Sequence, residues 1–237
     1  MRRSILLIAL AVVCATASAQ GVSKNLTLQL ATQHVFRGSV FTDGLVFQPK
    51  LDLGLSSNTL LTTRGSYDVN GAKRFDDWSV SLAQRFDAVL FSGTFGVVRY
   101  ERDNGMPDTS ELFVSAAMKW PVSMSFSLHK DIDTVGGLYV RATTAAGLPN
   151  ISVAGVSASV TWKGWLGYSE SKHAAAYYGA TGAGFADLGA RITGSFGVSS
   201  GTATAWAQLT TLVDPDYNSP NGDRTAFTIG ASLSLRF

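Results

Sequence analysis

Apolar and polar residues alternate one by one over most of this chain. The C-terminal segment is a clear case: Phe227, Ile229, Ala231, Leu233, Leu235 and Phe237 take every second position, with Thr, Gly, Ser and Arg between them. Successive side chains of a β-strand point to opposite faces of the sheet, so a period of two predicts strands with one apolar and one polar face. The longest such run extends unbroken from Val156 to Tyr168.

Breaks in the alternation come in two lengths, which follow one another in turn along the chain. Short breaks fall at 56–59, 87–88, 120–121, 146–150 and 199–201, and longer ones at 38–44, 70–77, 103–110, 131–136, 171–184 and 214–224. They delimit twelve predicted strands, at 25–37, 44–56, 60–69, 77–87, 89–102, 110–120, 122–131, 137–145, 152–170, 185–197, 202–213 and 224–237. An even strand number with short turns at one end and longer loops at the other is typical of outer-membrane barrels. We therefore predict an all-β fold, a closed antiparallel transmembrane β-barrel of about 12 strands with short periplasmic turns and longer extracellular loops.

A secreted β-sandwich also alternates and is the main competing interpretation. Composition favours the barrel, because 15% of the residues are charged and 46% are apolar, whereas an ordinary soluble domain has about 25% charged residues. Lipid can solvate an apolar sheet face only if the sheet closes, since hydrocarbon offers no partner to backbone groups at an open edge. The polar face, mostly Ser, Thr, Gly and Gln, then lines the inside.

The first residues have the features of an export signal. Arg2 and Arg3 precede an apolar run, Ile5 to Cys14, and Ala17-Ser18-Ala19 provides a cleavage site. The run is too short for a membrane span, which needs about 20 residues in a helix. We predict a signal peptide at 1–19, a barrel at 20–237, and a location in the outer membrane of a Gram-negative-type cell.

Loss of this leader simplifies the chemistry of the mature chain. The only cysteine, Cys14, goes with it, which removes disulfides, thiolate metal sites and a cysteine nucleophile. Lys plus Arg fall from 19 to 17 without Arg2 and Arg3, which equals the 17 Asp plus Glu. A balanced charge offers no broad attraction to nucleic acid, so we expect no such partner.

The phase of the alternation assigns charged residues to the inner, pore-lining face. The basic candidates are Arg37, Lys50, Arg64, Arg85, Lys119, Arg141, Lys163, Arg191 and Arg236; the acidic ones are Asp52, Asp68, Asp87, Glu111, Asp131 and Asp187. The basic excess predicts a slight preference for anions. Opposite charges can instead pair across the bore and plug it, because barrels near eight strands are filled whereas those of sixteen or more conduct. Both interpretations stay open at twelve strands.

The end of the chain carries a second signal. Gly230, Leu233, Leu235 and the terminal Phe237 resemble the C-terminal signal by which outer-membrane barrels are recognised for assembly. That resemblance implies two partners, the barrel-assembly machinery and outer-membrane lipid, besides the small polar solutes that a pore would pass.

Few residues suggest chemistry. His34, His129 and His173 lack the spacing of metal ligands and any evident partner for catalysis, and no nucleophile elbow or phosphate-binding loop occurs. We predict no catalytic residue, no metal and no cofactor. The acidic pairs at 76–77 and 214–216 are either Ca²⁺ ligands or solvated turns. The loop at 171–184 is either a constriction at the mouth or exposed surface.

A short N-terminal motif resembles a known group. His34-Val35-Phe36-Arg37-Gly38, followed by Thr42-Asp43-Gly44 and Gln48-Pro49, is similar to the first hairpin of exported bacterial proteins described as porins of the TorF type, in which Tyr usually stands where His34 does. The resemblance implies an outer-membrane barrel with a pore role and no catalytic residue. Gly38 would free the backbone to turn, and Arg37 would pair with an inward carboxylate at the barrel rim.

Three functional hypotheses follow. The first is a porin-like channel that passes small polar solutes or ions passively. The second is a closed barrel with a structural or surface-adhesion role. The third is a barrel hydrolase that acts on lipid, in which His129 would pair with a neighbouring wall serine.

Overall fold

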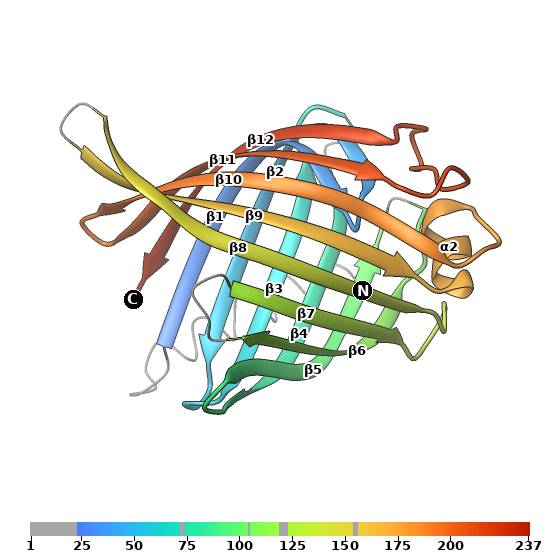
Figure 1. The fold of residues 1–237 in the computed structure, drawn as a ribbon, viewed down its shortest axis with the longest axis horizontal. Coiled ribbons are helices and arrows are strands. Elements are labelled where there is room, and N and C mark those ends of the chain that lie inside the picture. The colour runs from blue at the N-terminus through green and yellow to red at the C-terminus, as the bar shows by residue number, and fades with distance from the viewer. Residues whose placement is uncertain (1–22, 72–73, 104, 119–122, 154–155) are drawn as a thin grey trace.

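A computed structural model describes residues 23–71, 74–103, 105–118, 123–153 and 156–237. In these residues a single antiparallel sheet closes on itself as a barrel, each strand pairing with its sequence neighbours and the first with the last (Figure 1). The strands are β1 (Ser23–Phe36), β2 (Ser39–Gly54), β3 (Thr59–Asp68), β4 (Phe75–Asp87), β5 (Phe91–Arg102), β6 (Thr109–Met118), β7 (Ser123–Asp131), β8 (Leu138–Val153), β9 (Val156–Ser169), β10 (Gly184–Val198), β11 (Gly201–Leu212) and β12 (Thr225–Arg236). The predicted closed barrel of twelve strands is confirmed. The predicted signal peptide lies outside the described residues.

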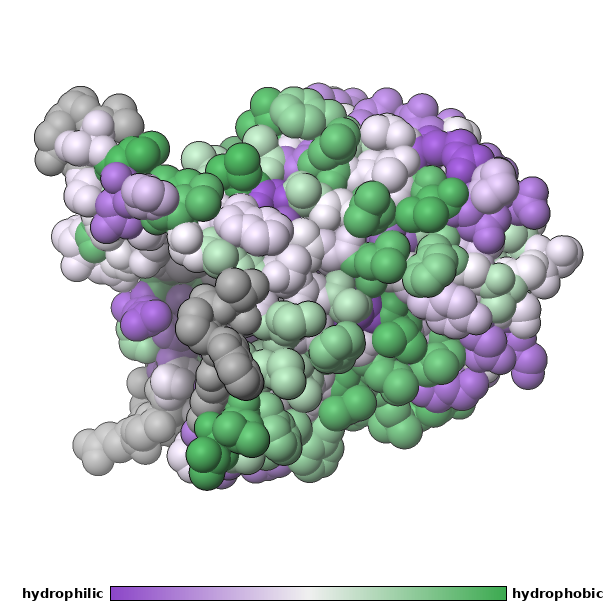
Figure 2. All heavy atoms as spheres, viewed as in Figure 1, coloured by the Kyte–Doolittle hydropathy of each residue, from purple (hydrophilic) through white to green (hydrophobic). Residues whose placement is uncertain are grey.

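The outer face of the barrel is apolar around its girth. Leu82, Val97 and Leu112 lie side by side on β4, β5 and β6 and are exposed. The same face carries further exposed apolar side chains around the wall: Leu30, Phe95, Val114, Phe126, Leu166, Leu188, Ile192, Leu209, Phe227 and Ile229. Figure 2 shows such residues over the middle of the wall, while hydrophilic residues gather at the end that holds the helix and the longer loops. A continuous apolar band of this kind suits hydrocarbon, not water. None of the described helices is long and apolar enough to cross a membrane.

The short break predicted at 146–150 is wrong. β8 continues to Val153, and a register shift between Leu148 and Ile151 absorbs the two residues in between. Proline is tolerated at 149 because this part of β8 extends past Ser123, the first described residue of β7, and among the described residues only β9 lies beside it. The β8–β9 hairpin therefore projects beyond the rest of the barrel at the short-turn end (Figure 1).

The longer loop predicted at 38–44 is also wrong. β1 and β2 continue almost to each other and are joined by Arg37 and Gly38 alone. Both residues have positive φ, 51° and 86°, as a two-residue turn of the type common in hairpins requires. The expected turning role of Gly38 is confirmed. Register shifts between Ala31 and Gln33, and between His34 and Val35, take up the remaining irregularity of the segment.

The loop at 171–184 contains a helix that the alternation did not predict, α2 (Ser171–Tyr178). It ends at Gly179, whose φ of 70° provides the left-handed residue that often terminates a helix. In Figure 1 it lies at the loop end of the barrel, after β9.

Candidate functional site

The turn between β1 and β2 is held inside the barrel mouth by an ion pair. The Arg37 guanidinium donates to both carboxylate oxygens of Glu111 on β6, at 2.8 and 2.6 Å. Both side chains are buried, with 5% of Arg37 and none of Glu111 exposed. A two-pronged contact of this kind is among the strongest that a guanidinium makes. The expected pairing of Arg37 with an inward carboxylate is confirmed.

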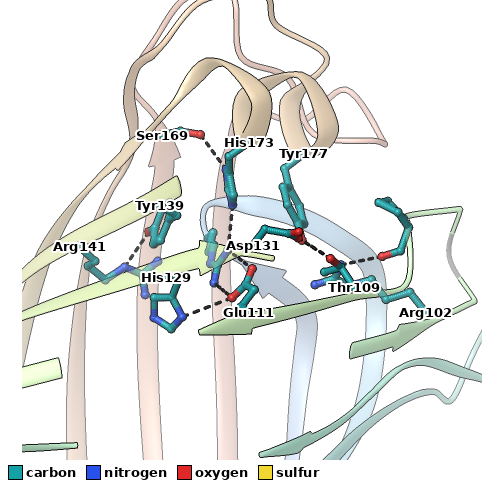
Figure 3. A network of polar contacts seen from close by, with 12 residues as sticks. Arg102, Thr109, Glu111, His129, Asp131, Tyr139, Arg141, Ser169, His173 and Tyr177 are labelled. Carbon is teal, nitrogen blue, oxygen red and sulfur yellow. Dashed lines mark hydrogen bonds and ion pairs between the residues drawn. The ribbon is translucent and has the colours of Figure 1, made fainter. Parts of the chain in front are cut away.

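His173 of α2 is the second partner of the turn. Its Nε2 lies 2.8 Å from a guanidinium nitrogen of Arg37, and its Nδ1 lies 2.7 Å from Ser169 Oγ (Figure 3). Burial, and then the positive charge of Arg37, lower the pKa of His173 to about 2. The imidazole is therefore neutral near pH 7. Because Arg37 can only donate, Nε2 accepts from it, and the ring proton on Nδ1 points to Ser169.

Aromatic stacking seats α2 on the barrel wall. The His173 ring stacks on Tyr139 of β8 at a centroid distance of 5.3 Å, and Tyr178 stacks on Tyr217, in the loop after β11, at 4.7 Å. The Tyr178 hydroxyl donates to the backbone carbonyl of Arg37 at 2.8 Å. We call the Arg37–Gly38 turn together with α2 the plug. The loop at 171–184 thus reaches into the mouth, the first of the two alternatives left open.

Asp187 on β10 anchors the wall next to the plug. Its carboxylate accepts from Tyr139 at 2.6 Å, from Trp165 at 2.7 Å and from Arg141 at 3.0 Å, and it is fully buried. Gly38 packs directly against it, since a Cβ on Gly38 would lie 2.4 Å from the Asp187 Cβ. No residue larger than glycine fits this position.

A basic cavity lies beneath the plug. It holds about 300 Å³, and four cationic side chains from separate strands line it: Arg64, Arg141, Lys163 and Arg191. Among the described lining residues Asp187 is the only carboxylate. We call this cavity the basic chamber.

The positive charge of the basic chamber is largely uncompensated. Asp187 pairs with Arg141. Arg191 instead donates to the Gln208 amide oxygen and lies 4.1 Å from the centre of the Trp206 ring, both of them neutral groups. Within the described ranges no ion pair involves Arg64, Lys163 or Arg191.

The remaining predicted pore-lining residues are distributed along the strands. Lys50 sits opposite Arg64 in the register and pairs with Asp52 at 2.8 Å. Asp68 accepts from the backbone N–H groups of 70 and 71 in the loop after β3. Arg85 and Arg236 do not line the chamber. Arg85 lines a second hollow that shares Ser127 with the chamber, Arg236 ends β12, and Lys119 lies outside the described residues.

The predicted assembly residues all lie on or just after β12. Gly230 makes room for the Trp206 ring, because a Cβ there would lie 2.3 Å from the indole. Leu233 and Leu235 pair with β1, and Phe237 is 63% exposed at the end of the chain. Their role in assembly remains a prediction.

The arrangement around the histidines does not favour catalysis or metal binding. Of the described residues, no three His, Cys, Asp or Glu side chains are grouped to hold a metal ion. Ser169 and His173 do form a Ser–His pair, but the third group is a cation, not the carboxylate that would make the imidazole a base. His129 lies 3.4 Å from Glu111, and His34 lies 3.6 Å from Asp77.

The two acidic pairs accept from protein donors. Asp76 accepts from the Thr42 hydroxyl, and Asp214 accepts from the backbone N–H of Asp216. The turn interpretation fits 214–216. For 76–77 the solvated turn is wrong, because Asp76 and Asp77 are buried near the start of β4.

Sequence reasoning missed α2 and the residues that seat it, Ser169, Tyr177 and Tyr178. A signal was present, because Ala174, Ala175 and Ala176 favour a helix and Gly179 favours its end.

Comparisons with known proteins find similarity in structure and none in sequence. No protein-family model matches the sequence, and no curated protein matches it either. Among solved structures, a KdgM porin superposes with a TM-score of 0.54 at 8% identity, covering 88% of this chain and 98% of that one. A KdgM porin in complex with disordered oligogalacturonate superposes with a TM-score of 0.53 at 6% identity, covering 90% of this chain and 98% of that one. A NanC porin superposes with a TM-score of 0.54 at 9% identity, covering 90% of this chain and 100% of that one. The chain therefore has the closed-barrel fold of outer-membrane porins, over nearly the full length of both.

Proposed function

We propose that this protein is an outer-membrane channel of the TorF porin type that passes small anionic solutes passively. The observation that carries the proposal is the basic chamber, where Arg64, Lys163 and Arg191 face the bore without a carboxylate partner among the described residues. A water-filled passage lined by one sign of charge concentrates ions of the other sign. Outer-membrane lipid and the barrel-assembly machinery are the partners that such a role requires.

The structural neighbours support the same solute class. One of them is a KdgM porin in complex with oligogalacturonate, an acidic saccharide. The chamber offers Arg guanidinium groups, which match carboxylates in shape. We infer small carboxylated solutes as the favoured class.

Charge selectivity provides the test. A cation about 8 Å from a passing anion contributes on the order of 1 kcal/mol after salt screening. In a planar bilayer with a salt gradient, the reversal potential of the wild-type protein should show anion preference. The Lys163→Gln and Arg191→Gln double variant should lower that preference roughly 30-fold, since two such contributions are lost.

A matched control comes from a lysine on the outer face. Lys24 pairs in register with Leu53, on the side of the sheet opposite the chamber residues, so Lys24→Gln should leave the reversal potential unchanged. Cation preference in the wild-type protein would contradict the proposal.

A closed barrel with a structural role is the second candidate. The specific observation in its favour is the plug, since the Arg37–Glu111 pair and α2 occupy the mouth. Complete absence of conductance, in the wild-type protein and in variants that release the plug, would favour this candidate.

A further inference from the structure

The hairpin tip that carries Arg37 is attached to the barrel differently from the strands below it. The ladder between β1 and β12 ends at Ala31 opposite Gly230, and the ladder between β2 and β3 ends at Val46 opposite Asp68. Beyond these points the two strands pair with each other as far as Phe36 and Ser39. The tip is thus a two-stranded ribbon with no other ladder among the described residues. Away from the turn it is held by side-chain contacts, among them Val40 N–H to Ser219 and Thr42 to Asp76.

Two register shifts in the β1–β2 ladder mark the base of the hairpin tip. One lies between Ala31 and Gln33 and another between His34 and Val35, where the ladder leaves the wall. Bulges of this kind bend a strand and re-aim its end, which here folds into the lumen. The bend brings the turn of β1 and β2 to β6, β8 and β10 on the far side of the bore.

The conformation at the turn needs contacts to maintain it. Arg37 has a φ of 51°, a left-handed conformation that residues other than glycine rarely adopt because it costs free energy. Three side chains oppose that cost: Glu111, His173 and Tyr178. Of these, Glu111 alone carries a negative charge.

The surrounding charge would expel Arg37 if Glu111 were neutral. The basic chamber lies directly beneath, and Arg37 is itself one of its lining residues, with Arg141 close enough to interact electrostatically. A buried guanidinium without its carboxylate is strongly unfavourable, and neighbouring cations add repulsion. Removing the Glu111 charge therefore favours a tip that has left the mouth.

From this geometry we propose that the plug is a gate latched by Glu111, and that breaking the Arg37–Glu111 pair swings the hairpin tip out and opens the basic chamber to the loop side. This inference rests on the proposed channel function, because a gate has meaning only for a passage. It identifies one ion pair as the regulator of the same site.

The first readout is movement of the tip and does not depend on conductance. Ser39 is fully buried next to the turn, with its Oγ 3.5 Å from the Tyr177 carbonyl. The described residues contain no cysteine, so Ser39→Cys provides a single reporter in the folded barrel. A charged methanethiosulfonate reagent should label the introduced thiol slowly in this parent and at least about 10-fold faster once Glu111→Gln is added, since the free energy lost with the pair exceeds one tenfold step.

Two further variants make the result specific. Arg37→Asn also breaks the pair, tolerates a left-handed backbone, and should give the same acceleration even if Glu111→Gln fails to fold. Asp133→Asn breaks an exposed ion pair with Arg99 at the loop end and should leave the labelling rate unchanged. We call Glu111→Gln and Arg37→Asn the latch variants. Equal labelling rates in the Ser39→Cys parent and in both latch variants would overturn the gate.

Conductance is the second readout and separates the two proposals. In planar bilayers the latch variants should conduct at least about 10-fold more on average than the wild-type protein, because the free energy lost with the Arg37–Glu111 pair exceeds one tenfold step. Fast labelling with no conductance in any variant would support the moving tip and refute the channel function. Conductance in the wild-type protein that the latch variants do not change, with unchanged labelling, would support the channel and refute the gate.

Discussion

Replacing Asp187 with alanine is expected to cost about 3 kcal/mol or more of the free energy of unfolding, because a buried charge pair loses one partner. The carboxylate accepts from Tyr139, Trp165 and Arg141 and is fully buried. Alanine leaves a phenol and an indole N–H without an acceptor, and each buried unpaired group costs about 1–3 kcal/mol. The Arg141 side chain is 27% exposed, so water in the chamber offsets part of its loss.

The measurement is urea unfolding of the folded barrel in lipid vesicles, followed by tryptophan fluorescence, since Trp165 reports directly on the site. The free energy of unfolding of Asp187→Asn should lie between the values for the wild-type protein and for Asp187→Ala, because the amide oxygen still accepts and the amide nitrogen does not. Asp52→Ala is the control. Asp52 bonds Thr62 and the Lys50 ammonium, whose side chain is 43% exposed, so its loss should cost no more than about 1 kcal/mol. An Asp187→Ala protein as stable as Asp52→Ala would refute this role.

Acidification is expected to loosen α2, and His173 is the cause. With α2 docked the pKa of His173 is about 2, against an ordinary value of 6.5 once the side chain is in water. The docked state therefore binds fewer protons between these values. Docking is at full strength above pH 6.5 and weakens as the pH falls below it, by a factor of ten in the docking constant per pH unit.

Hydrogen exchange of the α2 amides, corrected for the intrinsic effect of pH, measures this change. Protection should fall about 100-fold from neutral pH to pH 4.5, two units below the free value. The pKa of His173 also depends on the charges of Arg37, Glu111, Arg102 and His129. A comparison of the wild-type protein with a His173→Gln variant isolates the contribution of His173 itself. His173→Gln still offers an acceptor to Arg37 but does not titrate, and it should lose most of the pH dependence. Identical pH profiles in the two proteins would show that another group is responsible.

The alternation predicted more of the inner surface than of the mouth. Arg64, Arg141, Lys163 and Arg191 were assigned inward by phase, and all four line one chamber. Phase is a local property, because neighbouring side chains on a strand must point to opposite faces. It could not reveal that Asp187 would pair with Arg141 and leave the others uncompensated, since that depends on which strands lie close together.

Loop structure was the weakest part of the prediction. Pro149 and Asn150 predict a turn, yet β8 continues past them. On one side of β8 no described strand lies beside these residues, so no neighbour there needs the N–H that proline lacks. Thr42, Asp43 and Gly44 were read as a loop, yet they continue the β1–β2 hairpin. Turn-forming residues mark where a chain can turn, and the neighbouring strands decide where it does.

The alternation was sufficient to predict a closed barrel with an apolar outside and a charged inside, because a strict period of two leaves lipid as the solvent of one face and makes an open edge untenable. The family resemblance further implied that Gly38 turns the backbone and that Arg37 pairs with an inward carboxylate. The three-dimensional fold was needed to show that the Arg37–Gly38 turn folds back into the mouth, where it meets Glu111, 74 positions away, and His173, 136 positions away. Such contacts depend on the direction in which the hairpin bends and on the width of the bore, and neither is encoded in local spacing.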